Sequence, residues 1–441
     1  MAAEVRLGDH CSVQSSKRVF AREYVEQGVP FFRSKDVIDK ALGSFTGYDL
    51  FISEERFRQL KAQTGCPQKG DLLINSVGNR TGQSYIVGDE GDFYFKDGNI
   101  LWLNRFDGID PHWLSYWMKS KVGQDALASI MIGSAQKALT IDGLRKLWLR
   151  LPSLKEQTEA AALLRCLDEK IELNRRMNET LEEMARALFR DWFVDFSPTR
   201  RQMEGATDPA AIMGHAFPPE KAATLASLFP AKLGDDSLPE GWIKQPVREL
   251  AEIVGGGTPN TKTEAFWEGG THLWATPRDL SKLSGVFISN TERKLTDAGL
   301  AKVSSGLSPK GSVLMSSRAP IGYLAIASEA VAVNQGFIVM RPTDQFPTHF
   351  AKLWCEANME TIEANANGST FQEISKKNFK PILVTVPSSE VMAAFSRVAG
   401  MLFGKVQANE KENQTLAEMR DLLLPKLMSG EIRLKELETA I

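Results

Sequence analysis

Two polar loops of the sequence each place an arginine beside glycines. Residues 75–83 contain Arg80, and residues 316–322 contain Arg318. Glycine has no Cβ, so the backbone of such a loop lets a ligand approach closely. An arginine guanidinium donates two parallel hydrogen bonds to a guanine edge or to phosphate oxygens. These loops therefore indicate nucleic-acid recognition. The alternative for any one of these side chains is an ordinary solvated position in a loop.

A second pair of loops carries related chemistry. Residues 133–137 match residues 368–372, and each segment holds a glutamine, which can bond adenine through two hydrogen bonds. A lysine in the first segment can hold a phosphate. Two further cationic residues follow early strands at matching places. The residues predicted to bind DNA are Lys35, Arg80, Gln83, Gln136, Lys137, Arg278, Arg318, Gln372 and Lys376.

The chain matches itself at an offset of 235 residues. Pro152-Ser153 recurs as Pro387-Ser388, and residues 178–184 recur as 413–419. The register holds without a gap from 133 to 189, and residues 69–76 resemble 310–317 with a small shift. A repeat of this length is a duplicated two-part unit rather than a short-repeat solenoid. The plan is therefore globule, helix, linker, globule, helix.

Each half ends in a long predicted helix, at 154–196 and 388–430. Ser153 and Glu156 form a capping box before the first helix, whereas Val391 replaces the glutamate in the second. Gly400, Gly404 and Pro425 predict a weaker or bent second helix. Apolar residues step by three and four, as in a coiled coil. The predicted seam is Leu164, Leu167, Ile171, Asn174, Asn178, Leu181 and Leu188 in the first helix, and Leu402, Val406, Asn409, Asn413, Leu416 and Leu423 in the second.

The asparagines in this seam lower stability but fix register and partner. We expect the two helices to pair within one chain, antiparallel if an approximate two-fold relates the halves. The alternative is two independent amphipathic helices, each packed on its own globule.

Strands alternate with helices in both globules, so the predicted fold class is α/β (α+β). We expect two mixed α/β domains in a pseudo-two-fold repeat, separated by two long helices that form an antiparallel coiled coil. Strands are expected at 71–75, 84–87, 99–103, 312–315, 323–326 and 336–340, and helices at 111–121, 347–360 and 372–379. The expected divisions are 1–152 (the N-terminal globule), 153–196 (first helix), 197–241 (linker), 242–387 (the C-terminal globule), 388–430 (second helix) and 431–441 (tail).

Composition narrows the classes of function. Of the 441 residues 43% are hydrophobic and 24% charged, which is ordinary for a globular protein. The net charge is −2, but residues 1–150 hold 20 Lys and Arg against 18 Asp and Glu, and residues 243–386 hold 15 against 13. Each globule therefore carries +2, and any basic footprint is local. No apolar run is long enough for a membrane, and four scattered cysteines are typical of a reducing cytoplasm, so we expect a cytoplasmic protein.

Motifs for catalysis are missing from the sequence. There is no phosphate-binding loop of the P-loop type, no strand followed by G-x-G-x-x-G, and no zinc-binding histidine pattern. The glycines at 255–257 precede Pro259, which favours a turn over a nucleotide site. Asp168, Glu169 and Lys170 resemble part of a nuclease set but lie on a helix, where we expect a solvated charge run. We therefore predict no catalytic residue and no metal site in this chain.

Several motifs resemble those of a known family. Gly255-Gly256-Gly257-Thr258-Pro259, residues 314–322 and 334–337 resemble a target recognition domain of type I restriction–modification specificity (S) subunits. Residues 167–181 are similar to that family's central helix, and residues 424–431 to its C-terminal end. The resemblance covers nearly the whole chain. The N-terminal globule departs most, because Asn79-Arg80-Thr81 stands where the other globule has Arg318-Ala319-Pro320.

The resemblance implies a non-catalytic subunit that binds double-stranded DNA, each globule reading one half of a split asymmetric site. The helices would act as spacer and as dock for two methyltransferase (M) subunits, which carry S-adenosylmethionine and methylate adenine by base flipping. Two restriction (R) motor subunits that use ATP and Mg would complete the complex. This chain itself would need no cofactor and no membrane. The alternatives are a coiled-coil scaffold with two modules that do not bind DNA, and a divergent nuclease or methyltransferase acting alone.

Overall fold

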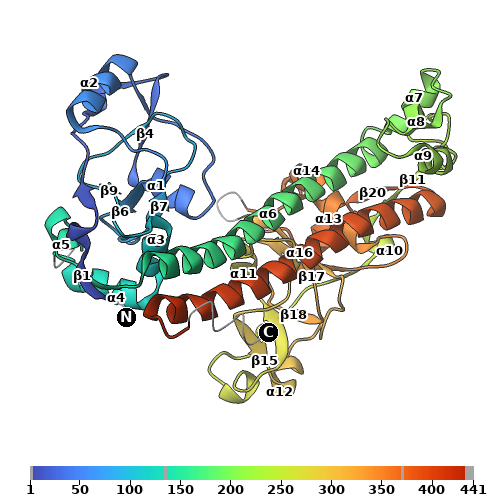
Figure 1. The fold of residues 1–441 in the computed structure, drawn as a ribbon. Helices are drawn as coiled ribbons and strands as arrows, with labels where there is room; N and C mark the ends of the chain where they lie inside the picture. Colours follow the sequence, from blue (N-terminus) through green and yellow to red (C-terminus); the bar gives the residue numbers. More distant parts are fainter. Residues whose placement is uncertain (1–2, 134–136, 369–371, 433–441) are drawn as a thin grey trace. The chain divides into compact units, whose positions relative to one another are not determined.

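The computed structural model of the chain describes residues 3–133, 137–368 and 372–432 (Figure 1). The chain folds as two units, Met1–Leu173 with Asn413–Ile441, and Asn174–Glu412. Each unit contains one globule and a part of both long helices. The boundaries between units therefore fall inside the helices and not at helix ends.

The N-terminal globule is a mixed α/β domain with two four-stranded sheets. The first is antiparallel, in the order β2-β9-β6-β7, and the second is mixed, in the order β3-β5-β4-β8. Its strands are β2 (Ser12–Gln14), β3 (Tyr24–Val25), β4 (Val29–Phe32), β5 (Phe51–Ile52), β6 (Leu72–Asn75), β7 (Ser84–Ile86), β8 (Tyr94–Phe95) and β9 (Ile100–Asn104). Its helices are α1 (Ser34–Ala41), α2 (Glu54–Thr64), α3 (Pro111–Lys119), α4 (Lys121–Ile130) and α5 (Ile141–Arg145).

The central strands of the first sheet, β6 and β9, are apolar up to their last residue, an asparagine in each, because both faces of the sheet are covered. Leu72, Ile74 and Leu103 belong to the same core as Trp113 and Trp117 of α3. The alternate residues Leu73, Ile100 and Trp102 pack with Phe32, Phe93 and Phe95 on the other side. Side chains alternate between the two faces of a strand, so only an unbroken apolar run fills both cores.

The C-terminal globule repeats this plan. Its main sheet has the order β12-β19-β16-β17-β14, so β12-β19-β16-β17 corresponds to β2-β9-β6-β7. A second sheet has the order β15-β13-β18. The strands are β12 (Glu252–Val254), β13 (His272–Ala275), β14 (Phe287–Ile288), β15 (Arg293–Leu295), β16 (Val313–Ser317), β17 (Ile321–Ala327), β18 (Val331–Val333) and β19 (Phe337–Arg341). The helices are α10 (Val247–Leu250), α11 (Pro277–Ser281), α12 (Asp297–Leu300), α13 (Thr348–Ala357), α14 (Met359–Ala364) and α15 (Lys376–Phe379).

A two-stranded antiparallel ribbon closes each globule. It pairs β1 (Ala3–Arg6) with β10 (Trp148–Leu151) in one case and β11 (Ile243–Pro246) with β20 (Leu383–Val386) in the other. In both globules the second strand of the ribbon leads directly into a long helix. The predicted mixed α/β class with two related domains is confirmed.

The two long helices are α6 (Leu154–Phe193) and α16 (Ser389–Ser429). At the start of α6 the Ser153 backbone N–H donates to the Glu156 carboxylate (3.0 Å), and the Glu156 N–H donates to the Ser153 hydroxyl (3.4 Å). Helix α16 runs without interruption through Gly400, Gly404 and Pro425, where the sequence had predicted weakness. Buried contacts along the helix outweigh the unfavourable propensity of these residues.

Contacts within the unit Asn174–Glu412 establish that the two helices run antiparallel there. Phe193, at the end of α6, packs against Phe395, near the start of α16, with ring centroids 4.8 Å apart. Earlier in α6, Asn178 meets Asn409, which is later in α16. Within this unit, later residues of α6 therefore contact earlier residues of α16, as in an antiparallel pair.

Residues 197–241, expected to be a linker, contain three short helices. These are α7 (Ser197–Met203), α8 (Pro209–Ile212) and α9 (Pro219–Ala226). Trp192 at the end of α6 packs edge-on against Phe229, and Phe193 packs against Trp242, with centroids 5.0 and 5.8 Å apart. Aromatic burial therefore fixes this connection to the helix ends.

Candidate nucleic-acid interface

In the C-terminal globule the two predicted loops lie side by side. Arg318 and Glu373 form an isolated antiparallel bridge, and the Ile374 N–H donates to the Ser317 carbonyl at 3.0 Å. An Arg318 guanidinium nitrogen also lies 3.8 Å from a Glu373 carboxylate oxygen. Arg318 remains about 41% exposed. Gln372, next to this bridge, is exposed, so both side chains are available to a ligand.

A glycine-rich loop completes this surface. A Cβ on Gly256 would lie 1.9 Å from the Val333 carbonyl oxygen, so only glycine fits there. The Trp274 indole N–H donates to the Gly257 carbonyl at 3.1 Å and holds the loop in place. The Thr258 hydroxyl donates to the side-chain oxygen of Gln335. This bond leaves the Gln335 amide nitrogen as a donor on an exposed residue.

Two of the predicted cationic residues, Lys376 and Arg318, join this surface, and Arg278 follows a residue that does. A Cβ on Gly255 would lie 3.0 Å from the Lys376 ammonium nitrogen, so that lysine covers the glycine loop. A Cβ on Gly336 would lie 3.6 Å from Nε of Arg318 and 3.2 Å from Pro277, the residue before Arg278. Arg278 is exposed and lies 3.7 Å from Glu292. Thr258 and Gln335 were not among the residues predicted to bind DNA, although the motifs at 255–259 and 334–337 contain them.

The N-terminal globule brings its two loops together in the same way. Val77 and Ala138 form an isolated bridge, and the Leu139 N–H donates to the Ser76 carbonyl at 2.9 Å. Arg80 is exposed and has no ion-pair partner among the residues that the structure describes. Its carbonyl accepts from the Asn75 side-chain amide at 2.9 Å, which fixes the loop.

The other N-terminal predictions differ in their settings. Lys137 is exposed beside the bridge, and Gln83 is half-buried at the end of the Arg80 loop. Gln136 lies outside the described residues. Lys35 is exposed on α1, where it adds to the effect of Arg33 in lowering the pKa of Asp49. Within the described ranges no hydrogen bond or ion pair joins Lys35 to the Arg80 loop.

The residues of the helix seam are shielded from solvent to different degrees. Every predicted seam residue is buried or half-buried, and Asn174 and Asn409 are fully buried. The Asn409 amide donates to the Asn178 side-chain oxygen, and the Asn174 amide donates to the Glu412 carboxylate, both at 2.8 Å. These polar contacts are satisfied only in one register.

Asp168 is a structural acceptor and not part of a solvated charge run. It accepts a hydrogen bond from the Tyr116 hydroxyl at 2.7 Å and from the Arg420 guanidinium at 2.9 Å. Burial, and then this bond to Asp168, raise the pKa of Tyr116. Asp168 therefore links α6 to both α3 and α16. This corrects the expectation that Asp168 belongs to a solvated charge run.

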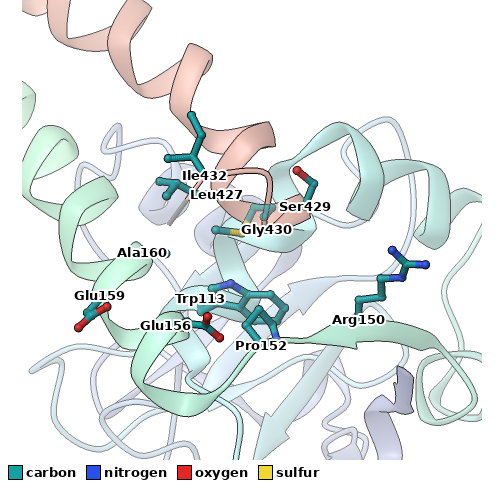
Figure 2. A pocket seen from close by; sticks show the side chains of 11 residues that line it. Trp113, Arg150, Pro152, Glu156, Glu159, Ala160, Leu427, Ser429, Gly430 and Ile432 are labelled. Carbon is teal, nitrogen blue, oxygen red and sulfur yellow. The ribbon is translucent and has the colours of Figure 1, made fainter. Parts of the chain in front are cut away.

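A small cavity lies where the end of α16 meets the start of α6. Figure 2 shows Trp113, Pro152 and Leu427 among the side chains around it. Its volume is about 50 Å³, well below the roughly 300 Å³ at which ligand pockets begin. Within the described parts of the chain there is also no cluster of His, Cys, Asp and Glu suited to a metal ion. None of the helices that the structure describes is long and apolar enough to cross a membrane.

Comparison with known proteins identifies the family that this architecture represents. The profile described as "Type I restriction modification DNA specificity domain" matches residues 2–183 and 239–393, one stretch for each globule. The chain belongs to this family and is a specificity subunit with two DNA specificity domains.

Individual relatives agree with this assignment. The chain is 27% identical to the type I restriction enzyme HindI specificity subunit of Haemophilus influenzae, over 83% of this chain and 87% of the relative. It is 31% identical to the MjaIX specificity subunit of Methanocaldococcus jannaschii over 41% of this chain and 42% of that one. A crystal structure of the S subunit of a type I restriction–modification system from M. genitalium shares the fold, with a TM-score of 0.58 at 16% identity, covering 97% of this chain and 96% of that one.

Proposed function

We propose that this subunit reads a bipartite, asymmetric DNA site, with one half-site for each globule, and performs no catalysis itself. One observation carries the proposal. In each globule the same two loops lie side by side at the ends of corresponding strands, and each pair presents an arginine. The side chains near these loops differ between the two globules. Thr258 and Gln335 lie in the C-terminal globule, and the N-terminal globule has no counterpart to this pair in its sequence. Because the two globules share a backbone arrangement but differ in the side chains of these loops, each globule can recognise a different half-site.

We further propose that α6 and α16 dock two methyltransferase subunits. Besides the seam, each helix has a second stripe of solvent-facing small and apolar residues, spaced by seven, seven, four and three positions along one side of the helix. Corresponding positions, 235 residues apart, are Cys166 and Met401, Leu173 and Ala408, Thr180 and Thr415, Met184 and Met419, and Ala187 and Leu422, all exposed. A helix with two apolar faces fits a bundle in which a partner covers the second face.

The repeat of this stripe supports two copies of one partner. Met184 is 53% and Met419 46% exposed, and they hold the same place in the two halves of the duplication. Equivalent surfaces bind equivalent partners, as in any duplicated interface. We expect S-adenosylmethionine on those methyltransferase subunits, and ATP and Mg on two restriction subunits that join them. Phosphate contacts made by these partners would offset the weak net charge of this chain.

The helices would also set the distance between the half-sites. A helix of 40 residues spans about 60 Å at 1.5 Å per residue. Insertion of four residues at matching points of both helices would lengthen each by about 6 Å. A change in the spacing of the methylated motif, with both half-sites kept, is the expected result. Unchanged spacing would contradict a spacer role.

Methylation mapping tests the reading of DNA. The full chain is produced with its methyltransferase partner, and methyladenine is mapped across the host DNA. We expect a split motif only when this chain is present. Arg80→Ala should relax one half of the motif and Arg318→Ala the other, because each arginine belongs to a different globule. Arg150→Ala is a matched control, since Arg150 is 77% exposed on the ribbon strand β10.

The outcomes separate the candidate functions. Loss of methylation at all sequences would make the altered arginine a phosphate anchor instead of a base reader. An active partner whose methylation does not depend on this chain would favour the scaffold. Turnover of DNA by the isolated chain would favour the independent enzyme.

A further inference from the structure

The segment after β2 concentrates positive charge around one exposed aromatic ring. Residues 15–22 contain three Lys and Arg and no Asp or Glu. The adjoining Glu23 accepts a hydrogen bond from the Phe20 N–H at 2.7 Å and is paired with Arg56 at 2.8 Å. Phe20 is 51% exposed, and the guanidinium carbons of Arg22 and Arg18 lie 5.3 and 6.0 Å from its ring centroid. Arginines at this range attract the ring face and restrict its motion. The Phe20 ring is therefore exposed to solvent and lies between two arginine side chains.

Hydrogen bonds anchor this segment to the frame of the globule. The Ser15 hydroxyl donates to the Ile100 carbonyl at 2.9 Å and accepts from the Gly98 N–H at 3.3 Å. The Ser16 hydroxyl donates to the Phe95 carbonyl at 2.6 Å. Arg18 also pairs with Asp97 at 3.2 Å. The segment therefore has a defined position against the turn at 97–99.

The same turn supports the Arg80 loop from its other side. The Ser76 hydroxyl donates to the Gly98 carbonyl, and the Ser76 N–H donates to the Asn99 carbonyl, both at 2.9 Å. Ser76 begins the loop that carries Arg80. The segment with Phe20 and the loop with Arg80 consequently flank one short turn.

The corresponding segment of the C-terminal globule has different chemistry. There the chain after β12 is the glycine-rich loop, and the Gly257 N–H donates to the Val333 carbonyl at 3.0 Å beside the matching turn. Its glycines bring backbone close to a ligand, whereas the N-terminal segment presents a ring and three cations. The N-terminal globule thus has a contact element that its copy lacks.

We propose that Phe20 is a further DNA contact, an apolar wedge that lies against a base step at the edge of the N-terminal half-site. Lys17 and Arg22, which have no ion-pair partner among the described residues, neutralise the phosphates on either side. Apolar side chains flanked by cations perform this role in proteins that unstack and bend DNA. The inference rests on the proposed function, because it needs a chain that binds DNA.

The test uses the full chain assembled with its methyltransferase, and duplexes that carry the motif found by methylation mapping. Phe20→Ala is expected to weaken binding by about 5- to 150-fold, the range for loss of one base–aromatic contact. Phe20→Trp should keep wild-type affinity. Trp148→Ala is the matched control, because Trp148 is 55% exposed in the same globule with Arg6 5.0 Å from its ring.

Two further readouts separate a wedge from a general loss. A 2-aminopurine scan across the half-site should show one step whose fluorescence rises with the wild-type complex and not with Phe20→Ala. Phe20 carries no charge, so its loss should leave the salt dependence of binding unchanged. Arg22→Ala should reduce the slope of log K against log salt concentration by about 0.9.

The results distinguish this inference from the function on which it rests. A wild-type complex that neither methylates nor binds a specific motif would refute the proposed function. A wild-type complex that binds, with Phe20→Ala binding equally well, would overturn the wedge alone. Equal weakening by Phe20→Ala and Trp148→Ala would also overturn it, because the loss would then not depend on the place of the ring.

Discussion

The asparagine pair in the helix seam offers a sharp test of why the two helices pair in one register. Asn409 is fully buried and Asn178 is 8% exposed, and one hydrogen bond of 2.8 Å joins them. Asn178→Leu would leave the Asn409 amide buried without this acceptor. An unsatisfied buried polar group costs about 1–3 kcal/mol. We expect Asn178→Leu and Asn409→Leu each to lower the free energy of unfolding by that amount.

The double variant should recover much of this loss. The Asn409 side-chain oxygen has no hydrogen-bond partner among the described residues, so the native pair is only partly satisfied. Replacing both partners by apolar residues is nearly neutral or stabilising, because no polar group is then stranded. The two single effects should therefore be strongly non-additive, with a coupling of about 1–3 kcal/mol.

Calorimetry of the full chain measures this cycle. For a unit of this size each kcal/mol shifts Tm by about 2–4 °C, so each single variant should melt several degrees below wild type. The matched control is Asn290→Leu at an exposed position, with an expected effect within about 0.5 kcal/mol. A double variant that loses the sum of the two single effects would refute the reasoning.

Three further predictions concern other parts of the structure. Gly256→Ala should abolish recognition of the C-terminal half-site, as measured by methylation mapping, because its Cβ would lie 1.9 Å from a carbonyl oxygen. Burial, and then the charge of Lys352, lower the pKa of His349 to about 4. Because the unfolded chain binds that proton near pH 6.5, stability should fall between pH 6.5 and 4, by up to about 3 kcal/mol, and His349→Phe should remove this part of the slope in denaturation curves. Met184→Glu combined with Met419→Glu should weaken co-purification of the methyltransferase at least tenfold, because each places a charge on an apolar contact.

Each of these predictions has a matched comparison. Gly269→Ala alters a glycine with no neighbour within 4 Å of its Cβ, although its φ of +70° adds some strain, so it should keep both half-sites. Wild type at pH 7.5 serves as the reference for His349→Phe, and an unchanged slope below pH 6.5 would contradict the assignment. Glu179→Lys changes an exposed charge on α6 outside the second stripe, and loss of partner equal to that of the methionine variants would count against the stripe.

Much of the architecture could be predicted from residue order alone. The 235-residue offset and the seam of α6 and α16 are periodic, and the period of a helix indicates which of its faces is buried. The strands β6, β9, β16 and β19 are instead marked by short, nearly continuous apolar runs, which indicate burial on both faces. The first helix was expected to reach residue 196 but ends at Phe193, and Phe196 adopts a left-handed conformation before α7 begins with Pro198 nearby. The spacing of apolar residues predicts that a helix forms, but it does not predict the residue at which the helix ends.

The composition of the proposed DNA-binding surface depended on the tertiary structure. Glycines in the sequence mark the loops of Arg80 and Arg318, but no spacing pairs Thr258 with Gln335, which stand 77 residues apart. The position of Asp168 on a helix suggests a solvated carboxylate, whereas Tyr116 and Arg420 approach it from distant segments. Spacing along the chain determines which elements form and which faces they bury. Only the packing of those elements decides which side chains meet, because contacts between distant segments leave no period in the sequence.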